Sequence, residues 1–498
     1  MGVTSLEARI EKLTALLDVG KAMASERSLD RLLQLILDEV TRVMEADRSS
    51  LFLVDRTRNE LHSTIAQGLA VREIRVPIGT GIAGYVAQTG ETVNIRDAYA
   101  DPHFNQATDL KTGYRTRTIL CVPMRTKLNE VIGVLQVLNK RDGIFTAEDE
   151  ELLLALSSQA AVAIENAILY EDIQKLFEGF IKASVYAIES RDPTTSGHSE
   201  RVAILTVGLA ERVDRTDIGP FASIRFSAED MRELRYVSLL HDFGKVGVRE
   251  PVLVKARKLY EADLDLVIAR FKFIRKALEN ETLHKKLGLA LSLGPAAARE
   301  MAALDQELQR QLAEVDASLQ VILEANRPTV LPSGGFERLL EVAANTFEDF
   351  DGTRRPYLTT QEAENLTIGK GSLNPQERLE IESHVTHTFR FLRQIPWPKD
   401  LRRIPTIAYA HHEKPNGSGY PNALRGEAVP LQAKIMAVCD IYDALSAADR
   451  PYKKAVTPEV ALEILQMEAR DGHLDPELVR IFIEDQVWRL TLSMRAVA

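Results

Sequence analysis

The stretch HHEKPNGSGYP (411–421) places two adjacent histidines and an acid in front of a glycine-rich turn. Far upstream, VSLLHDFGKVGV (237–248) ends an apolar helical run with a histidine and an aspartate. Imidazole nitrogens and carboxylate oxygens are donors that divalent first-row metals take. A carboxylate on a buried helix face is costly unless it is paired or bound to a metal. Lys245 follows Asp242 by three residues, where it can pair with this carboxylate or meet a phosphate. The two stretches together predict a metal centre.

Further candidate donors lie on amphipathic segments. In RLEIESHVTHTFRFL (378–392), His384 faces the core side, and His387 is either a supporting group or, more simply, an exposed residue. His411 and His412 point about 100° apart on a helix, which suits two neighbouring cations. Asp440 ends the apolar run AKIMAVCD and can bridge two ions, although alone it would be read as a helix cap.

The composition is that of a globular chain. Its 498 residues are 45% hydrophobic and 27% charged, which suggests about two to four domains. A net charge of −10 argues against a general binder of nucleic-acid polymers or anionic membranes. No run of eighteen apolar residues is present, so we expect a cytoplasmic protein without a membrane span. Cys121 and Cys439 lie in apolar runs and are expected to be buried free thiols.

The N-terminal third changes its periodicity several times. In residues 5–46, apolar side chains recur every three or four residues, which predicts a helix. Short β-branched runs predict strands at 49–55, 60–66, 116–124 and 130–139, with a glycine-rich helix start at 79–90. A long helix is expected from Thr146, where Thr146 and Asp149 resemble a capping box. This order predicts an α+β module.

Residues 29–167 resemble a GAF domain, after an N-terminal helix at 1–28. The stretch NKRDGIFTAEDE matches the signature of GAF domains in cyclic-nucleotide phosphodiesterases and cyclases. The matching residues are Asn139, Lys140, Phe145, Asp149 and Glu150. The resemblance implies an antiparallel sheet flanked by helices and a cyclic mononucleotide or another small ligand. The alternative is that Lys140 and Asp149 form a structural ion pair, and that the domain binds something else or only dimerises.

One helical pattern runs from 157 to 189 without a breaker and includes a connecting signalling helix at 168–185. Its apolar stripe continues past the GAF-like module, as in Ile173, Leu176 and Phe180. Such a helix commonly pairs with its copy, so we expect a homodimer. The alternative is an amphipathic helix that packs on its own domain.

The rest of the chain is helical in pattern, with a first catalytic part at 186–253 and a second at 371–498. Between them, residues 254–370 carry two coiled-coil-like seams and a glycine- and proline-containing turn at 287–298, which predict an inserted helical hairpin. The border segments VKARKLYEADLDLV and IGKGSLNPQERLEI resemble each other. The hairpin could serve as a lid, a dimer arm or a partner dock.

The helical part closely resembles the HD-GYP family of phosphodiesterases, which act on cyclic di-GMP. The shared motifs span about 186–252 and 371–480 and include ESRDPTTSGHSERV, HDFGKVGV, HHEKPNGSGYP and CDIYDALSAADRPYKKA. By resemblance, the metal ligands would be His241, Asp242, His384, His411, His412 and Asp440. Lys245 and Asp242 would act in catalysis, with Lys245 at the scissile phosphate. Tyr420, Arg450 and Lys453 would bind the substrate.

Two positions depart from the family pattern. His198 matches a histidine near the metals, but Thr194 stands where members with a third metal have a glutamate, so two cations are expected. Asn416 stands where the family usually has an aspartate, which keeps the turn-forming hydrogen bond and removes a charge. Histidine-rich ligation admits iron, manganese, nickel or zinc. We expect iron or manganese, with nickel, zinc or magnesium as alternatives.

The expected activity is metal-assisted hydrolysis of cyclic di-GMP to pGpG, GMP or both, regulated by the GAF-like domain. The first alternative is a catalytically silent scaffold that binds nucleotides or partner proteins. The second is an HD phosphohydrolase that acts on another cyclic dinucleotide, such as mixed cyclic GMP-AMP, or on a nucleotide.

Overall fold

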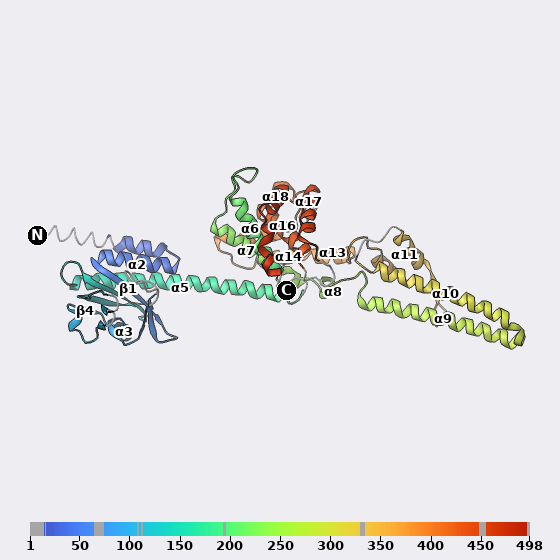
Figure 1. The fold of residues 1–498 in the computed structure, drawn as a ribbon, viewed down its shortest axis with the longest axis horizontal. Helices are drawn as coiled ribbons and strands as arrows, with labels where there is room; N and C mark the ends of the chain where they lie inside the picture. The colour runs from blue at the N-terminus through green and yellow to red at the C-terminus, as the bar shows by residue number, and fades with distance from the viewer. Residues whose placement is uncertain are drawn as a thin grey trace. The chain divides into compact units, whose positions relative to one another are not determined.

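The computed structural model describes residues 14, 16–63, 74–106, 109–110, 113–192, 196–328, 334–447 and 455–495. The chain divides into two compact units, Met1–Gly179 and Phe180–Ala498. The boundary falls inside α5 (Ala147–Glu189), the long helix predicted from Thr146 onward (Figure 1). The expected capping box is present at its start, because Thr146 N donates to Asp149 Oδ2 and Asp149 N donates to Thr146 Oγ1.

The first unit contains a six-stranded sheet in the order β3-β2-β1-β6-β5-β4, and every neighbouring pair is antiparallel. The strands are β1 (Ala46–Asp55), β2 (Glu60–Ser63), β3 (Ile74–Pro77), β4 (Val93–Ile95), β5 (Ile119–Arg125) and β6 (Val131–Lys140). The sequence predicts four of them. It misses β3 and β4 because four and three residues are too few to show a clear alternation.

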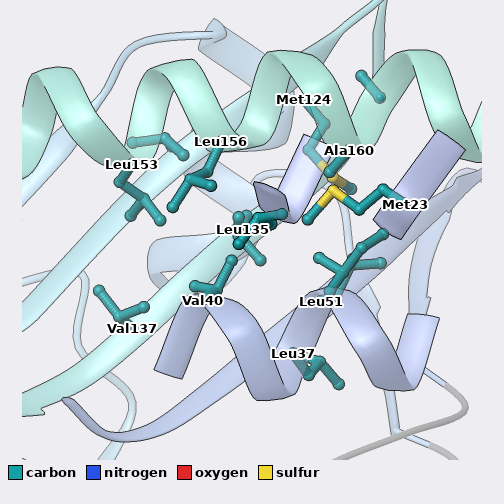
Figure 2. Close-up of a cluster of buried hydrophobic side chains, with 14 of the residues drawn as sticks. Met23, Leu37, Val40, Leu51, Met124, Leu135, Val137, Leu153, Leu156 and Ala160 are labelled. Carbon is teal, nitrogen blue, oxygen red and sulfur yellow. The ribbon is translucent and has the colours of Figure 1, made fainter. Parts of the chain in front are cut away.

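Helices cover both faces of this sheet. On one face, α2 (Leu29–Val43) and the first half of α5 share a core with the strands. Figure 2 shows Val40 of α2, Leu135 of β6 and Leu156 of α5 gathered in this apolar layer. On the other face, α3 (Gly81–Thr89) packs on Phe52, Leu61 and Val134. The expected antiparallel α+β architecture is therefore confirmed.

The continuous helix predicted over 5–46 is wrong at two points. In its described part the chain leaves the helix at 26–28, where the Glu26 carboxylate accepts hydrogen bonds from Arg27 N and Ser28 N. Strand β1 also begins at Ala46, because that residue already pairs with Lys140 of β6. The side chain of Glu26 competes locally with the helical hydrogen bonds.

Among the described residues, α5 is the one helix that is long and apolar enough to cross a membrane by length and composition. Of its most apolar window, 44% is buried. Leu153, Leu156 and Ala160 lie in the core of the first unit, so burial accounts for much of the apolar composition there. Farther along, Ile173 and Leu176 are 63% and 75% exposed.

In the described residues of the second unit, the regular elements are helices (Figure 1) and one two-stranded ribbon. Outside the insertion its helices are α6 (His198–Asp214), α7 (Ala228–Leu240), η3 (Phe243–Gly247), α8 (Glu250–Leu253), α13 (Pro375–Glu382), α14 (His384–Leu392), η5 (Lys399–Leu401), α15 (Ile404–Tyr409), η6 (Gly426–Ala428), α16 (Leu431–Ser446), α17 (Pro458–Arg470), α18 (Pro476–Glu484), η7 (Val487–Thr491) and α19 (Leu492–Arg495). Cys439 of α16 and Cys121 of β5 are buried and free, as predicted.

The expected helical hairpin is present and consists of α9 (Glu261–Leu293) and α10 (Ala298–Ala325), joined at η4 (Gly294–Ala297). The predicted seam is buried at Phe271, Ile274 and Ile322. The insertion also contains elements that the sequence analysis did not predict. These are α11 (Gly335–Ala344), the two-stranded ribbon of β7 (Thr346–Glu348) and β8 (Arg354–Pro356), and α12 (Thr360–Leu366). Three-residue strands carry almost no periodic signal.

The two borders of the insertion lie against each other. The Lys255 ammonium is 2.8 Å from both carboxylate oxygens of Glu377, and Tyr260 donates its hydroxyl to Glu377 Oε1 at 2.6 Å. Ser372 Oγ donates to the carbonyl of Lys255. The chain therefore leaves and re-enters the helical domain at one point, as an insertion requires.

We expect Glu377→Ala to lower the free energy of unfolding of the second unit by about 3–5 kcal/mol, because it leaves the buried Lys255 ammonium without its partner. Urea unfolding followed by circular dichroism measures the change. Glu337→Ala, at an exposed position of α11, is the control and should shift the transition little. Equal stability of the two variants would contradict the role given to Glu377.

Candidate metal centre

Three buried imidazoles present an unpaired Nε2 atom. His241, His384 and His411 each donate Nδ1–H to the main-chain carbonyl three residues earlier. The acceptors are Ser238, Ile381 and Ala408, at 2.7, 2.6 and 2.6 Å. Within the described part of the chain, none of the three Nε2 atoms has a hydrogen-bond partner. Buried polar atoms are rarely left unpaired, so these lone pairs fit a metal.

The donors form two adjacent groups. The ligand atoms of each group lie within 4.8 Å of one another; the groups are His384, His411 and His412, and His198, His241 and Asp242. Asp242 also connects the groups, because Oδ1 is 3.2 Å from His384 Nε2 and Oδ2 is 3.5 Å from His241 Nε2. The bridging position that the sequence analysis offers to Asp440 is therefore better suited to Asp242.

Asp440 lies at the second group. Its Oδ1 is 3.2 Å from His198 Nε2 and 3.9 Å from His241 Nε2. Helix α16 positions this carboxylate, and α6 begins at His198. Six donors expected from the sequence and His198 are thus close together, although they come from five separate places in the chain.

Sequence reasoning missed two residues behind His198. Asp443 Oδ2 is 2.8 Å from His198 Nδ1, and Arg201 donates Nε and Nη2 to the same carboxylate at 2.9 and 3.1 Å. Burial opposes the charged imidazole, but Asp440 and Asp443 outweigh it and raise the pKa of His198 to about 9. A cation at His198 Nε2 would therefore displace a proton. The three-residue spacing of Asp440 and Asp443 on one helix face is the signal that could have revealed Asp443.

Three other donors have the charge states that metals require. Burial, with repulsion from neighbouring imidazoles, lowers the pKa of His411 well below its ordinary value, and burial lowers the pKa of His412 to about 4. Burial alone would raise the pKa of Asp242, but Lys245 and the neighbouring histidines lower it well below its ordinary value. Neutral imidazoles and ionised carboxylates are the forms that bind cations.

Lys245 lies beside the bridging carboxylate. Its Nζ is 2.7 Å from Asp242 Oδ2 and 3.6 Å from Asp192 Oδ2. Burial opposes the charge, but the two carboxylates prevail and raise the pKa of Lys245. Lys245 therefore stays cationic next to both groups, where a phosphate could be recognised.

The turn with His241 and Asp242 packs tightly on α14. A Cβ at Gly244 would lie 1.9 Å from the carbonyl oxygen of His384 and 2.4 Å from Thr388 N. Thr388 Oγ1 accepts from Gly244 N at 2.8 Å and donates to the carbonyl of His241 at 2.9 Å. These contacts fix the two donor segments together. The second candidate of this helix, His387, packs instead on Gly247 and belongs to neither group.

The 411–421 loop and the residues directly after it close around a buried acid. Glu413 accepts hydrogen bonds from Asn422 N and Leu424 N at 2.7 and 2.8 Å. Gly419 has no room for a side chain, since its Cβ would lie 2.4–2.6 Å from the backbone of 412–414. The loop places the Tyr420 ring 4.8 Å from the ring of His412.

The hydrogen bonds of Asn416 explain why an asparagine can stand at this position of the loop in place of an aspartate. Its Oδ1 accepts from Ser418 N at 2.9 Å, as an aspartate could. Its Nδ2 donates to the carbonyl of Asp471 at 3.1 Å, which a carboxylate could not do. The amide thereby ties the loop to the connection between α17 and α18. Arg450, Lys453 and Thr194, three other residues of the sequence analysis, lie outside the described residues.

In the first unit, the GAF-like signature is structural. Lys140 Nζ is 3.1 Å from Asp149 Oδ1, and both side chains are about nine-tenths buried. Asn139 Oδ1 accepts from Arg117 N, and its Nδ2 donates to the Tyr114 hydroxyl. Phe145 belongs to the core and Glu150 to the first turn of α5. The ion pair that the alternative expects between Lys140 and Asp149 is therefore present, whereas the ligand of the domain stays a prediction.

A separate cavity of about 190 Å³ lies elsewhere in this unit, and neither Lys140 nor Asp149 is among its lining residues. Polar groups in its wall include Arg48, Thr80, Asp109, Tyr114 and Gln136. Asn139 reaches this wall only through its bond to Tyr114.

We expect Gly244→Ala to disrupt the centre, because the added methyl group has to push the His241–Asp242 turn away from α14. The unfolding free energy should fall by about 1–3 kcal/mol and bound metal should decrease. Gly288→Ala in α9 is the control, since a Cβ there meets nothing within 4 Å. Elemental analysis and thermal unfolding test the pair. Full metal content in Gly244→Ala would show that the close packing is not required.

Two protein-family models match the chain: GAF domain over residues 28–164 and HD domain over residues 361–478. A probable 3′,5′-cyclic phosphodiesterase of Caenorhabditis elegans is 38% identical over 173 residues, which are 32% of this chain and 24% of that protein. The dual 3′,5′-cyclic-AMP and -GMP phosphodiesterase 11A of Takifugu rubripes is 38% identical over 175 residues. The match covers 32% of this chain and 19% of that protein. The chain spans about a quarter or less of the length of these relatives.

Among solved structures, the GAF domain of a phosphoenolpyruvate-protein phosphotransferase from Coxiella burnetii is 23% identical, with a TM-score of 0.31. It covers 33% of this chain, and the match includes 98% of that chain. The HD match contains His384, His411, His412 and Asp440, whereas His198, His241 and Asp242 precede it. The chain therefore joins an N-terminal GAF domain to a helical HD domain.

Proposed function

We propose that this protein is a metal-dependent phosphodiesterase that hydrolyses cyclic di-GMP, with regulation through its GAF domain. One observation carries the proposal: two groups of metal donors share the Asp242 carboxylate beside the cationic Lys245. Paired cations about 3.5–4 Å apart are a recurring device for in-line displacement at phosphate. We expect iron or manganese, because the donor set combines imidazoles, which suit iron, with carboxylates, which suit manganese.

The ligands of the two cations would be His241, Asp242, His384, His411, His412 and Asp440, with His198 at the second group. When bound, the cations would activate a water and withdraw charge from the phosphate. Lys245 gives one N–H to Asp242 and has others for a phosphate oxygen, so it can neutralise charge that develops in the transition state.

Other residues hold this arrangement in place. Arg201 and Asp443 fix the His198 ring, and Thr388 fixes the turn ahead of Lys245. Tyr420 lies over His412 and would limit the access of water on that side. We assign Tyr420, Arg450 and Lys453 to substrate binding from the resemblance of their motifs to the HD-GYP family.

Cyclic mononucleotides are the second candidate substrates, because the curated relatives are named as phosphodiesterases of these compounds. The Gly419–Tyr420–Pro421 turn beside His412 favours cyclic di-GMP, since it belongs to the HD-GYP resemblance. The GAF cavity would take a cyclic mononucleotide or another small ligand. The cytoplasm is the expected compartment.

We expect purified protein to contain about two divalent ions per chain and to hydrolyse cyclic di-GMP to pGpG, GMP or both. Asp242→Asn should lose metal and lower turnover on the order of a hundredfold or more, because Asp242 serves both groups. Elemental analysis and chromatography of cyclic di-GMP, mixed cyclic GMP-AMP, cyclic AMP and cyclic GMP measure both effects.

Glu427→Gln, at an exposed position of η6, is the matched control and should keep metal and activity. Removal of metal by a chelator should stop hydrolysis, and Mn²⁺ or Fe²⁺ should restore it. If the protein hydrolyses cyclic AMP or cyclic GMP but neither cyclic dinucleotide, cyclic mononucleotides would be its substrates in place of cyclic di-GMP. Full activity and metal content in Asp242→Asn would contradict the role given to Asp242, and a metal-loaded wild-type protein that hydrolyses none of the four compounds would end the hydrolase proposal.

We further propose that α5 pairs with its copy in a homodimer. Ile173, Leu176 and Phe180 are spaced three and then four residues apart and are 46–75% exposed within one chain. Ile173→Glu combined with Leu176→Glu should give monomers in light scattering after gel filtration. Lys175→Glu, on another face of the helix, should not. A wild-type monomer at micromolar concentration would contradict the pairing.

A further inference from the structure

The residues just after α5 reach the turn that carries Lys245. Arg191 donates Nη1 to the carbonyl of Val246 and Nη2 to the carbonyl of Val248, the latter at 2.9 Å. Both carbonyls lie at the end of η3, where a helix has no internal donors left for its last oxygens. A positive charge is also favoured at this end. Arg191 therefore supplies the missing donors and the charge.

Asp192, the residue after Arg191, contacts the side chain of Lys245. Asp192 is 4% exposed, and its Oδ2 is 3.6 Å from Lys245 Nζ. Lys245 is thus restrained from two directions by consecutive residues. Arg191 fixes the backbone on its C-terminal side, and Asp192 lies beside its ammonium group.

The last residue of α5 makes a third connection to the metal centre. Glu189 Oε2 accepts a hydrogen bond from Gly197 N at 2.9 Å. Gly197 is the residue directly before α6, and α6 begins with His198. The short stretch 189–192 therefore contacts both the start of the His198 helix and the Lys245 turn.

We propose that Arg191 is a positioning residue for phosphodiester hydrolysis, which holds Lys245 in place through the carbonyls of Val246 and Val248. The inference rests on the proposed function of the centre. Arg191 belongs to neither group of metal donors, so its loss affects the placement of Lys245 and leaves the cations bound.

Arg191→Ala should lower kcat for cyclic di-GMP about tenfold, with KM within about twofold and unchanged metal content, since the cations and the substrate pocket stay intact. Arg191→Lys should be intermediate, because an ammonium lacks the planar fork that reaches two carbonyls. A purely structural role would instead lower metal content and thermal stability together with activity.

Hydrogen exchange gives a readout that needs no substrate. In Arg191→Ala, the amides of 244–248 should exchange faster than in wild type. The control is Arg225→Ala, because the Arg225 guanidinium also donates to two main-chain carbonyls, those of Ala222 and Ile224, in a turn without metal donors. That variant should leave kcat and the exchange of 244–248 unchanged.

Unchanged kcat and unchanged exchange at 244–248 in Arg191→Ala would overturn the proposal, and so would a loss of activity that only follows a loss of metal. If Arg191→Ala does not fold, the same comparison is made with Arg191→Lys. If wild-type protein hydrolyses none of the cyclic nucleotides, the proposed function fails, whereas the exchange experiment still decides whether Arg191 orders the turn.

Discussion

The arrangement depends on one buried carboxylate. Asp242 is within 3.2–3.5 Å of imidazoles from two donor groups and 2.7 Å from the Lys245 ammonium. An ionised carboxylate loses a large hydration energy on burial, so partners must be present wherever the fold places it. Several segments of the helical unit contribute to the surroundings of Asp242. Helix α14 supplies His384 and the Thr388 clamp, and Gly244 allows the approach.

Sequence patterns that involve residues only a few positions apart were sufficient to predict many local features of this protein. The Asp242–Lys245 pair, the Thr146–Asp149 cap and the seam of the hairpin all depend on helical spacing, which is legible in one sequence. The donor chemistry of the 237–248 and 411–421 stretches predicted a metal centre, but the full ligand set with His384 came from a resemblance to known motifs. Periodicity alone places each histidine on a helix and does not say which helices meet.

Contacts between distant segments could not be predicted in this way. Thr388 bonds to the carbonyl of His241 across 147 positions, and Arg201 to Asp443 across 242. Neither residue type is unusual at its place, so nothing in the sequence separates it from an ordinary helical residue. The sequence showed that Asn416 departs from the family pattern, but it did not show why. The hydrogen bond from its side chain to the carbonyl of Asp471 forms only because the connection between α17 and α18 packs beside the loop.

The insertion shows why a long interruption is compatible with a precise centre. The entropy of closing a loop grows only slowly with its length, so the cost depends little on how many residues are inserted. What matters is that the ends return to the same place, and the Glu377 contacts to Lys255 and Tyr260 accomplish this. The spacing between Asp242 and His384 along the chain is therefore free to vary, while the spacing between their ligand atoms is not.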